Sequence, residues 1–450
     1  MKGILNKKEP VLLFLGDIAV FSLSLWVSLL VRYRGIPSVD QFFDNLIPFG
    51  ILFLVWTLSF FIAGLYETHR VIIRNRLPEI LFKTQVVNIS IAVVFFYFFS
   101  VFGITPKTIL FIYVIISLLL IVFWRITALL FFVSNKKSKA ILIGSGNDAE
   151  SLFTEVNKSS RYNFEFCTNI KPESLEAVDF EKEVIDMVYS EDIKIVVIDS
   201  TNEKLSPYLP HFYNLIFSNV QFIDFYKLFG EIFYKYPVSL LSYGWFIQNI
   251  SLSAHSFYDI SKRTTDIIVS LLCGLLSLVF YPFIILSLLI EGGGNVFIRQ
   301  NRIGQDNKII KIIKFRTMAF NDNGVYGSEN KNYVTKVGKF LRKSRLDELP
   351  QLWNVFKGDL SLIGPRPELQ DLVRKYSDAI PYYNVRHIIK PGLSGWAQIY
   401  HHEHPHHGIN IEETINKLSY DLFYIKNRSI ILDIMIALKT IKTLLSREGR

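Results

Sequence analysis

The chain has very few cysteines. Only Cys167 and Cys273 occur among its 450 residues, and Cys273 lies inside an apolar run. Neither a disulfide framework nor a cysteine-ligated metal cluster is therefore supported. A cleavable signal peptide is not evident either, because the first apolar stretch is long and lacks a small-residue cleavage site. We therefore expect that stretch to remain in the mature protein.

Apolar residues are abundant, and the charge balance is positive. Half of the residues are hydrophobic and 15% are aromatic. The mean hydropathy of +0.29 is high for a soluble protein. The net charge of +9 fits contact with anionic lipid headgroups or anionic small molecules. The composition therefore predicts a membrane protein.

Four apolar segments in the first part of the chain are long enough to cross a bilayer, which needs about 20 residues. They predict a four-helix transmembrane domain over residues 1–135. The segments are residues 11–31, 43–65, 80–102 and 109–133.

Basic residues flank these segments unevenly. The loops before the first, after the second and after the fourth segment are basic, which predicts that they are cytoplasmic. Arg32 and Arg34 on the other side weaken this bias without reversing it. Arg125, inside the fourth segment, is either a functional intramembrane charge or, as we favour, a residue that snorkels or faces a neighbouring helix. The basic loop residues are Lys2, Lys7, Lys8, Arg70, Arg74, Arg76, Lys136, Lys137 and Lys139.

Residues 136–255 alternate between strand-like and helix-like patterns, which predicts a small α/β domain of Rossmann type. Gly144, Gly146 and Ala149 fit a relaxed G-x-G-x-x-G/A pattern after the first strand. The second strand lacks a closing acidic residue, since FEFCTNI ends around Asn169. We therefore favour a regulatory or assembly module over nucleotide binding. The other strand-like runs are residues 140–143, 195–198 and 220–225.

The apolar run at residues 267–290 is long enough to span, yet basic residues stand on both sides of it. Both flanks therefore prefer the cytoplasmic face. Pro282 breaks the helix, because it removes an N–H and clashes with the preceding turn. A re-entrant helix over residues 256–292 satisfies both observations, with the Ser277 or Ser287 hydroxyl serving the freed backbone groups. A fifth, kinked span is the alternative.

Residues 293–450 are compact and basic, and they begin with a turn and a hairpin of short strands. Lys314 and Arg316 alternate around Phe315, so we expect both to project from one face of a strand. Two fixed cations of this kind suit a diphosphate ligand.

The segment SRLDELPQLWNVFKGDLSLIGPRPE, residues 344–368, predicts a short helix that follows two carboxylates, Asp347 and Glu348. Pro350 fits only the first turn of this helix, and Gly358 fits its end. Its apolar positions have helical spacing, which predicts one buried face. These positions are Leu349, Leu352, Trp353 and Phe356.

The two carboxylates are therefore expected at a helix N-terminus, where backbone N–H groups favour anions. Cations surround them in sequence, which suits a phosphate substrate with a divalent metal. Ordinary partners of the helix dipole are the alternative for the two carboxylates. The cations are Arg342, Lys343, Arg345 and Arg366.

The C-terminal part contains HHEHPHH, residues 401–407. It is either a transition-metal site or, as we favour, a mobile polar loop, because Pro405 and the uninterrupted spacing argue against a fixed tetrahedral site. The final stretch, residues 419–445, mixes apolar and basic residues and predicts an interfacial amphipathic helix.

Four blocks in this order resemble bacterial sugar transferases, the polyprenyl-phosphate phosphoglycosyl transferases with one membrane-inserted catalytic domain. They are KFRTM, LDELPQ, NVFKGDLSLIGPRP and PGLSGWAQ, within residues 262–440. Lys262, Arg263 and Asp266 are similar to the family's entry motif. The chain departs from the family pattern at Thr317, where serine is usual, and at Arg345, where a small residue is more common. The closing motif is matched by Asp421, Tyr424, Asn427, Ser429 and Asp433.

The resemblance implies transfer of a sugar phosphate from a UDP-sugar to undecaprenyl phosphate, with release of UMP. It implies magnesium at Asp347 and Glu348, with Asp347 as the nucleophile that forms a phosphosugar intermediate. It also implies phosphate-binding roles for four cations, and Asp421 is a further candidate site residue. The four cations are Lys314, Arg316, Arg342 and Arg366.

The long form resembles proteins of the bacterial inner membrane that start exopolysaccharide, capsule or O-antigen chains, with the catalytic domain, residues 293–450, on the cytoplasmic face. The expected partners are a UDP-sugar, undecaprenyl phosphate and the lipid bilayer, and no nucleic acid. A homo-oligomer and contact with polysaccharide-assembly machinery are left open, as is the identity of the sugar. Because every matched block follows residue 261, a fragment of residues 256–450 is expected to keep some activity. The alternative function is a membrane-bound regulator or scaffold with a ligand-sensing Rossmann-like domain.

Overall fold

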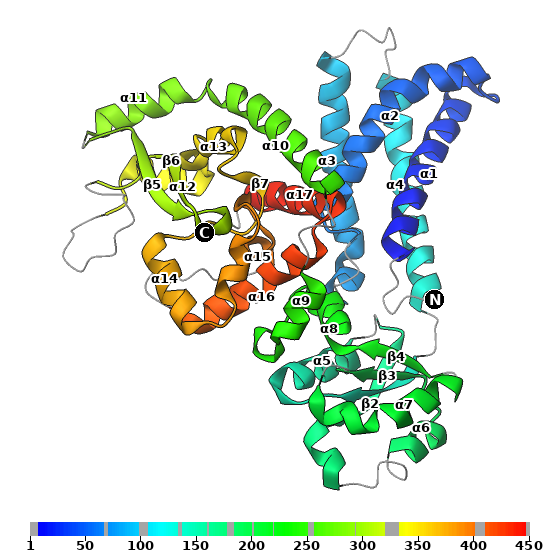
Figure 1. Cartoon of the computed structure of the whole chain (residues 1–450). Coiled ribbons are helices and arrows are strands. Elements are labelled where there is room, and N and C mark those ends of the chain that lie inside the picture. The colour runs from blue at the N-terminus through cyan, green and yellow to red at the C-terminus, as the bar shows by residue number, and fades with distance from the viewer. Residues whose placement is uncertain are drawn as a thin grey trace. The chain divides into compact units, whose positions relative to one another are not determined.

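The computed structural model divides into two compact units, Met1–Leu228 and Phe229–Arg450, which are described separately (Figure 1). It describes residues 8–66, 71–98, 107–133, 137–159, 162–177, 184–199, 202–218, 220–250, 256–292, 294–319, 333–400 and 410–446.

The first unit begins with four helices that are long and apolar enough to cross a membrane, as the sequence predicts. Helix α2 starts with a capping box, in which Ser38 and Gln41 each bond the backbone N–H of the other. Aromatic side chains fill the interior between the helices, and Trp56 and Tyr113 stack with ring centroids 5.3 Å apart. The helices are α1 (Lys8–Tyr33), α2 (Val39–Ile62), α3 (Val71–Phe98) and α4 (Lys107–Val133).

Arg125 faces neighbouring helices rather than the membrane surface. Its Nε lies 3.1 Å from Oδ1 of Asp17, and its Nη1 donates to the Leu65 carbonyl at 2.8 Å. Tyr66 donates its hydroxyl to the other oxygen of Asp17 at 2.7 Å. Asp17 and Arg125 are both buried. The Arg125 side chain therefore links α1, α4 and the end of α2. This agrees with the favoured interpretation that Arg125 faces a neighbouring helix.

An α/β sheet completes the first unit, and its four strands are parallel in the order β2–β1–β3–β4. The predicted parallel α/β domain is thus confirmed. Helix α5 (Gly146–Lys158) follows the first strand, and short helices join the others: η2 (Pro172–Ala177), α6 (Asp186–Ser190), η4 (Glu203–Tyr208), α7 (Leu209–Leu215) and η5 (Ile216–Ser218). The strands are β1 (Ser138–Ile143), β2 (Phe164–Ile170), β3 (Ile195–Ile198) and β4 (Gln221–Asp224).

The turn between β1 and α5 has the close packing that a glycine-rich pattern requires. A Cβ on Gly144 would stand 3.1 Å from the Cβ of Ala149, and Gly146 has a φ of +78°. These glycines therefore allow the helix to start close to the strand. The favoured role of this domain, a regulatory or assembly module rather than nucleotide binding, stays a prediction.

The second unit starts within α8 (Phe225–Phe233), earlier than the sequence boundary at residue 256. The segment that follows contains η6 (Val238–Leu240) and α9 (Tyr243–Asn249). The Tyr236 amide donates to the Ser419 carbonyl at 3.1 Å, and Trp396 Nε1 donates to the Tyr234 carbonyl at 2.8 Å. Residues 229–249 therefore pack as part of the second unit.

The bent helix pair expected around Pro282 is present. Helices α10 (Ser256–Ser277) and α11 (Tyr281–Glu291) meet at 56°. The carbonyl of Leu278, which Pro282 cannot bond, accepts from the Tyr281 amide at 3.2 Å. The Ser277 hydroxyl donates to the Gly274 carbonyl in the last turn of α10 at 2.7 Å, as the sequence suggested, because the Leu278 amide bonds the Leu275 carbonyl there. Ser287 donates to the Phe283 carbonyl within α11.

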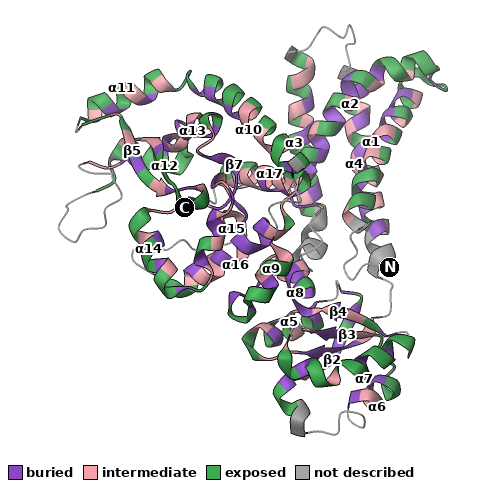
Figure 2. Cartoon of the chain, viewed as in Figure 1, coloured by how far each residue is buried: buried purple, intermediate pink, exposed green. Residues whose placement is uncertain are grey.

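Large apolar residues of this helix pair are exposed, and Figure 2 shows much of α10 and α11 in the colour of exposed residues. Exposed apolar surface on this scale is what contact with lipid requires. The bend is confirmed, and re-entry to the same face stays a prediction. The exposed residues include Ile268, Leu272, Leu276, Phe283, Leu286 and Ile290.

The predicted hairpin follows as antiparallel strands β5 (Phe297–Ile303) and β6 (Ile309–Phe315), joined through η7 (Gln305–Asn307). A second, parallel pair of short strands joins β7 (Ser361–Ile363) to β8 (Gly392–Ser394). The helices of this region are α12 (Lys336–Ser344), η8 (Leu346–Glu348), α13 (Gln351–Lys357), α14 (Gln370–Ala379), η9 (Tyr383–His387) and α15 (Trp396–Tyr400).

The final stretch forms two helices, where the sequence suggested one interfacial helix. Helix α16 (Ile411–Asn427) is largely buried. Helix α17 (Ile430–Ser446) exposes Ile431 and Ile434, so the membrane-surface interpretation suits this second helix alone. Ser429 separates the two, and its hydroxyl accepts from the Leu432 amide at 3.3 Å.

The predicted buried face of α13 is wrong. Phe356 is 39% exposed, whereas Gln351, Asn354 and Val355 are buried. Trp353 lies against α10, where its ring would stand 3.7 Å from a Cβ on Gly274. Trp353 of this apolar stripe therefore lies against α10, while Leu349 packs against the buried cluster that contains Phe315 and Leu341.

Candidate active site

Asp347 and Glu348 lie in the 3₁₀ turn η8, which leads directly into α13. Arg345 ends α12 in the left-handed conformation, with a φ of 57°. Leu349 and Pro350, between η8 and α13, both have right-handed helical dihedrals. These two residues, called the dyad below, therefore lie just before the N-terminus of α13, as the sequence suggested.

Glu348 is held by two cations. Its Oε1 lies 3.1 Å from Arg366 Nη2 and 3.9 Å from Lys314 Nζ. Burial alone would raise the pKa of Glu348, but Arg366 and Lys314 outweigh it and lower the pKa to about 2. Glu348 is therefore ionised at neutral pH.

Asp347 has a different environment. Burial and the neighbouring Glu348 charge raise its pKa to about 6, against the opposing effect of Lys314, Arg342 and Arg345. Its Oδ1 is buried and has no hydrogen-bond partner among the described residues. A buried carboxylate oxygen without a partner is costly, so it is available to an incoming group.

Lys314 reaches the dyad from β6. Burial lowers its pKa to about 8, against the raising effect of Glu348. Asn354 fixes this strand against α13, because its Nδ2 donates to the Lys311 carbonyl at 2.8 Å and its Oδ1 accepts from the Ile313 amide at 3.1 Å.

Arg316 and Arg342 have other contacts than the sequence suggested. The Nη2 of Arg316 donates to the carbonyls of Leu288 and Gly292, at 2.9 and 2.5 Å, and so holds the end of α11. The Nε of Arg342 donates to the Thr317 hydroxyl at 2.9 Å. The threonine at this motif position therefore keeps a hydroxyl acceptor. Lys314 contacts Glu348 whereas Arg316 contacts the end of α11, and their shared role as a phosphate-binding pair stays a prediction.

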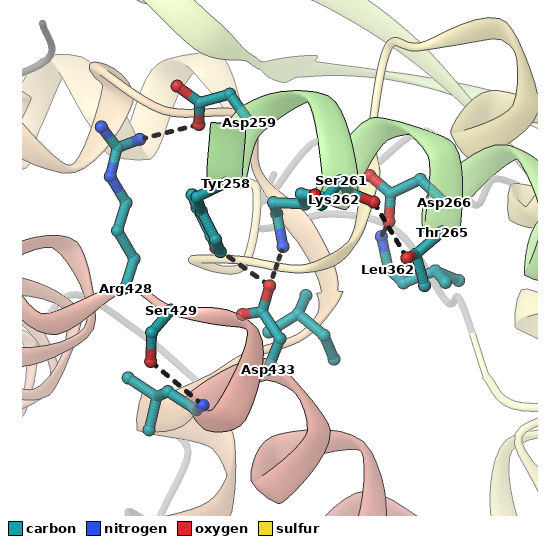
Figure 3. Close-up of polar contacts among 12 residues, drawn as sticks. Tyr258, Asp259, Ser261, Lys262, Thr265, Asp266, Leu362, Arg428, Ser429 and Asp433 are labelled. Atoms are coloured by element: carbon teal, nitrogen blue, oxygen red, sulfur yellow. Dashed lines mark hydrogen bonds and ion pairs between the residues drawn. The ribbon is translucent and has the colours of Figure 1, made fainter. Parts of the chain in front are cut away.

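The strap of residues 361–368, which carries Arg366, is fixed by α10 and α16. Asp266, on α10, accepts from the Leu362 amide at 3.0 Å (Figure 3). The Tyr424 hydroxyl lies 3.4 Å from the Ile363 carbonyl. Arg263 donates to the Val355 and Phe356 carbonyls at 2.8 Å each, which caps α13.

A second anchor joins α10 to α17. Lys262 Nζ lies 2.8 Å from Oδ2 of Asp433, and the Tyr258 hydroxyl donates to the same oxygen at 2.9 Å (Figure 3). The entry motif and the closing motif of the sequence therefore meet here as structural contacts.

Asp421 lies in a buried ion cluster apart from these contacts. Its Oδ2 is 2.8 Å from Arg386 Nη2, and burial raises its pKa. Glu368 ion-pairs with Lys417 and, at 3.7 Å, with Arg386 Nη1. Sequence reasoning missed Glu368, Arg386 and Lys417.

The carboxylates of Asp347 and Glu348 suit a bound magnesium ion, but they do not form a closed metal cage. Within the described ranges, no three His, Cys, Asp or Glu side chains gather to hold an ion. Magnesium is commonly bound by one or two carboxylates together with substrate phosphates. The unpartnered Oδ1 of Asp347, beside Glu348, meets this requirement. The histidine-rich run at residues 401–407 lies outside the described residues, and so does its proposed role.

Comparison with known proteins gives the family. Residues 257–447 match the family described as Bacterial sugar transferase. The UDP-N-acetylgalactosamine-undecaprenyl-phosphate N-acetylgalactosaminephosphotransferase of Aeromonas hydrophila is 40% identical over 205 residues, which is 44% of this chain and 47% of that protein. The undecaprenyl-phosphate galactose phosphotransferase of Salmonella typhimurium is 28% identical over the full length of both.

A third relative is covered over most of its length. The UDP-glucose:undecaprenyl-phosphate glucose-1-phosphate transferase of Caulobacter vibrioides is 34% identical over 202 residues, which is 42% of this chain and 72% of that protein. The matched region contains the dyad, its cations and the helix pair that fixes them. The chain belongs to the bacterial sugar transferase family.

Proposed function

We propose that this protein transfers a sugar-1-phosphate from a UDP-sugar to undecaprenyl phosphate, giving undecaprenyl-diphosphate-sugar and UMP. The observation that carries the proposal is the unlike pair of carboxylates: Glu348 is ionised and held by Arg366, while Asp347 keeps an oxygen without a partner. The names of the relatives support a UDP-sugar donor and a lipid phosphate acceptor.

The reaction proceeds in two steps. First, an oxygen of Asp347 forms a bond to the sugar-bearing phosphorus, and the bond from that phosphorus to the bridging oxygen breaks, so that UMP leaves with the electron pair. An oxygen of undecaprenyl phosphate then attacks the same phosphorus and releases the Asp347 carboxylate. The raised pKa of Asp347 makes it a better nucleophile than an ordinary aspartate, while it stays ionised at neutral pH.

The cations bind and orient the phosphates. Arg366 and Lys314 lie at Glu348, on one side of the attacking carboxylate. Arg342 and Arg345 supply positive charge near Asp347. Arg316 acts indirectly, because it holds the end of α11.

Asp347 and Glu348 would hold Mg²⁺. When bound, the ion neutralises diphosphate charge and lowers the cost of bringing a carboxylate to a dianion. Glu348 keeps its negative charge there because Arg366 and Lys314 hold its pKa low.

The reaction takes place at the cytoplasmic face of the bacterial inner membrane, where the soluble donor is available and the bent helix pair meets the lipid acceptor. It is the first step of an exopolysaccharide, capsule or O-antigen chain. The names of the relatives given above refer to the transfer of different sugars. The sugar is therefore left open between glucose, galactose and N-acetylgalactosamine.

The test uses the purified full chain in lipid nanodiscs with Mg²⁺, undecaprenyl phosphate and each of three donors: UDP-glucose, UDP-galactose and UDP-N-acetylgalactosamine. We expect UMP release and a lipid product whose mass identifies the sugar. No UMP release from any of the three donors would contradict the proposal, and would favour a membrane-bound regulator.

A further inference from the structure

A buried cluster of four charged side chains lies at the end of the strap of residues 361–368, which carries Arg366. Glu368 belongs to the strap, Arg386 to η9, and Lys417 and Asp421 to α16. Arg386 and Asp421 are 2% and 1% exposed. Two cations and two anions balance, so the cluster carries no net charge that would need water. It lies outside the dyad, and the reaction described above makes no use of it.

Arg386 is the centre of this cluster. Its Nη1 donates to the Tyr383 hydroxyl at 2.8 Å, and its Nη2 lies 2.8 Å from Asp421 Oδ2. The same Nη2 donates to the backbone carbonyl of Arg366 at 3.1 Å. One planar guanidinium therefore joins η9, α16 and the backbone of a residue whose side chain contacts Glu348.

The two residues after Arg366 are held in the same way. The carbonyl of Pro367 accepts from Arg302 Nη1 at 3.1 Å. The carbonyl of Glu368 accepts from the Ile303 amide at 3.0 Å. Three consecutive carbonyls of the strap are thus fixed by groups of the hairpin and of η9, which leaves the backbone of Arg366 little freedom.

Stability alone does not account for such a cluster. Buried ion pairs are on the whole no more stabilising than apolar side chains of similar volume, because desolvation offsets their attraction. Their fixed geometry does specify where the joined elements lie. A hydrogen bond such as that from Arg366 Nη2 to Glu348 Oε1, at 3.1 Å, is lost when the backbone moves by about 1 Å.

We propose that Arg386, held by Asp421 and Tyr383, is a positioning residue that sets the backbone of Arg366 so that its guanidinium meets Glu348 and the donor phosphate. This inference rests on the proposed function, and it adds a residue that touches neither substrate nor dyad. Asp421 then acts through Arg386 rather than in the chemistry itself.

The test uses the full chain in nanodiscs and the donor, among the three named above, that the wild type turns over. Arg386→Lys keeps the charge but removes the two-nitrogen fork that contacts Tyr383, Asp421 and the Arg366 carbonyl. Tyr383→Phe removes one hydroxyl and keeps the fold. Arg428→Lys is the matched control, because Arg428 is a buried arginine of the same unit that pairs with Asp259 at 3.6 Å and lies outside the cluster.

A misplaced Arg366 weakens donor binding, whereas a loss of folded protein lowers the maximal rate and leaves KM unchanged. We expect Arg386→Lys to raise the donor KM about tenfold and to lower kcat, and Tyr383→Phe to raise KM about threefold. Arg428→Lys should leave KM at the wild-type value. If Arg386→Lys does not fold, Tyr383→Phe decides the question.

Unchanged KM values in the folded variants, with an active wild type, would overturn this inference and leave the proposed function standing. A drop in maximal rate that only follows the folded fraction would overturn it equally. An inactive wild type with all three donors would contradict the proposed function, and this inference with it.

Discussion

The guanidinium of Arg366 lies 3.1 Å from Glu348 and makes the two neighbouring carboxylates chemically unlike. Glu348 has a pKa of about 2, and Asp347 has a pKa of about 6. Two adjacent carboxylic acids in similar surroundings repel each other when both are ionised, so one of them would keep its proton to a higher pH. Both carboxylates are therefore ionised at neutral pH, but Glu348 is held by Arg366, while Asp347 keeps a buried oxygen without a partner among the described residues.

The first prediction concerns the nucleophile. Asp347→Asn nearly keeps the shape but removes the attacking anion, so turnover should fall by about a thousandfold or more. Mass spectrometry of the wild type, incubated with donor and no lipid acceptor, should find a phosphosugar adduct on Asp347 that the variant lacks. Full activity of Asp347→Asn would contradict the assignment and leave direct attack by the lipid phosphate.

The second carboxylate should behave differently. Glu348→Gln removes the partner of Arg366, so activity should fall by about a hundredfold through weaker handling of metal or acceptor phosphate. Some adduct on Asp347 should still form in this variant when donor is present. An adduct yield in Glu348→Gln as low as that in Asp347→Asn would show that the two residues act in the same step.

The pH dependence of the reaction follows from two groups whose pKa values are shifted, Asp347 and Lys314. As pH falls through about 6, Asp347 gains a proton and loses its attacking anion, because its pKa is raised. As pH rises through about 8, Lys314 loses its positive charge, because its pKa is lowered. A plot of kcat/KM against pH should therefore be bell-shaped, with its maximum between these values.

Lys314→Arg provides the control for the basic limb. An arginine side chain stays charged over the accessible pH range. The decline above pH 8 should therefore disappear, while the acid limb stays in place. A basic limb that persists in Lys314→Arg would assign it to another group.

Residues 229–249 should matter to the catalytic unit. A fragment of residues 229–450 keeps the contacts of Tyr236 and Trp245, which are both 3% exposed, with α16. A fragment of residues 256–450 loses them, so it should unfold at a lower temperature in the same detergent and retain only part of the activity. Equal unfolding temperatures and rates for the two fragments would show that the segment is dispensable.

The buried pair Asp17–Arg125 predicts a stability effect in the first unit. Arg125→Met leaves a buried carboxylate without its cation and should lower the free energy of unfolding by about 3 kcal/mol or more. The double variant Asp17→Leu with Arg125→Met should recover most of this loss. Thermal unfolding in detergent would measure both, and an equal loss in the double variant would contradict the explanation.

Membrane topology provides the last prediction. Single cysteines placed at Lys262 and Arg299, in a chain without native cysteines, should react from the cytoplasmic side of sealed vesicles. Lys262 precedes and Arg299 follows the apolar run at residues 267–290 of the bent helix pair, so labelling on one side only is the signature of re-entry. Arg299 accessible solely from the outside would show that the pair crosses the membrane.

Local patterns in the sequence were enough for several features. Apolar run length predicted four membrane-length helices, because a bilayer requires a fixed span. Pro282 predicted the helix break, because the missing N–H acts on its own turn. The motif blocks around Asp347 and Arg366 predicted the family, which the comparisons confirm.

Tertiary structure decided how these residues are used. Arg316 holds the end of α11, and Asp421 pairs with Arg386, contacts that no local pattern indicated. Trp353 of α13 lies against α10, and residues 229–249 pack with the catalytic unit. Electrostatic environment and burial depend on contacts between segments far apart in the chain, and no local pattern encodes which segments meet. The sequence alone therefore determined where the two carboxylates stand, and only the folded chain determined that Glu348 pairs with Arg366 while Asp347 keeps a buried oxygen without a partner among the described residues.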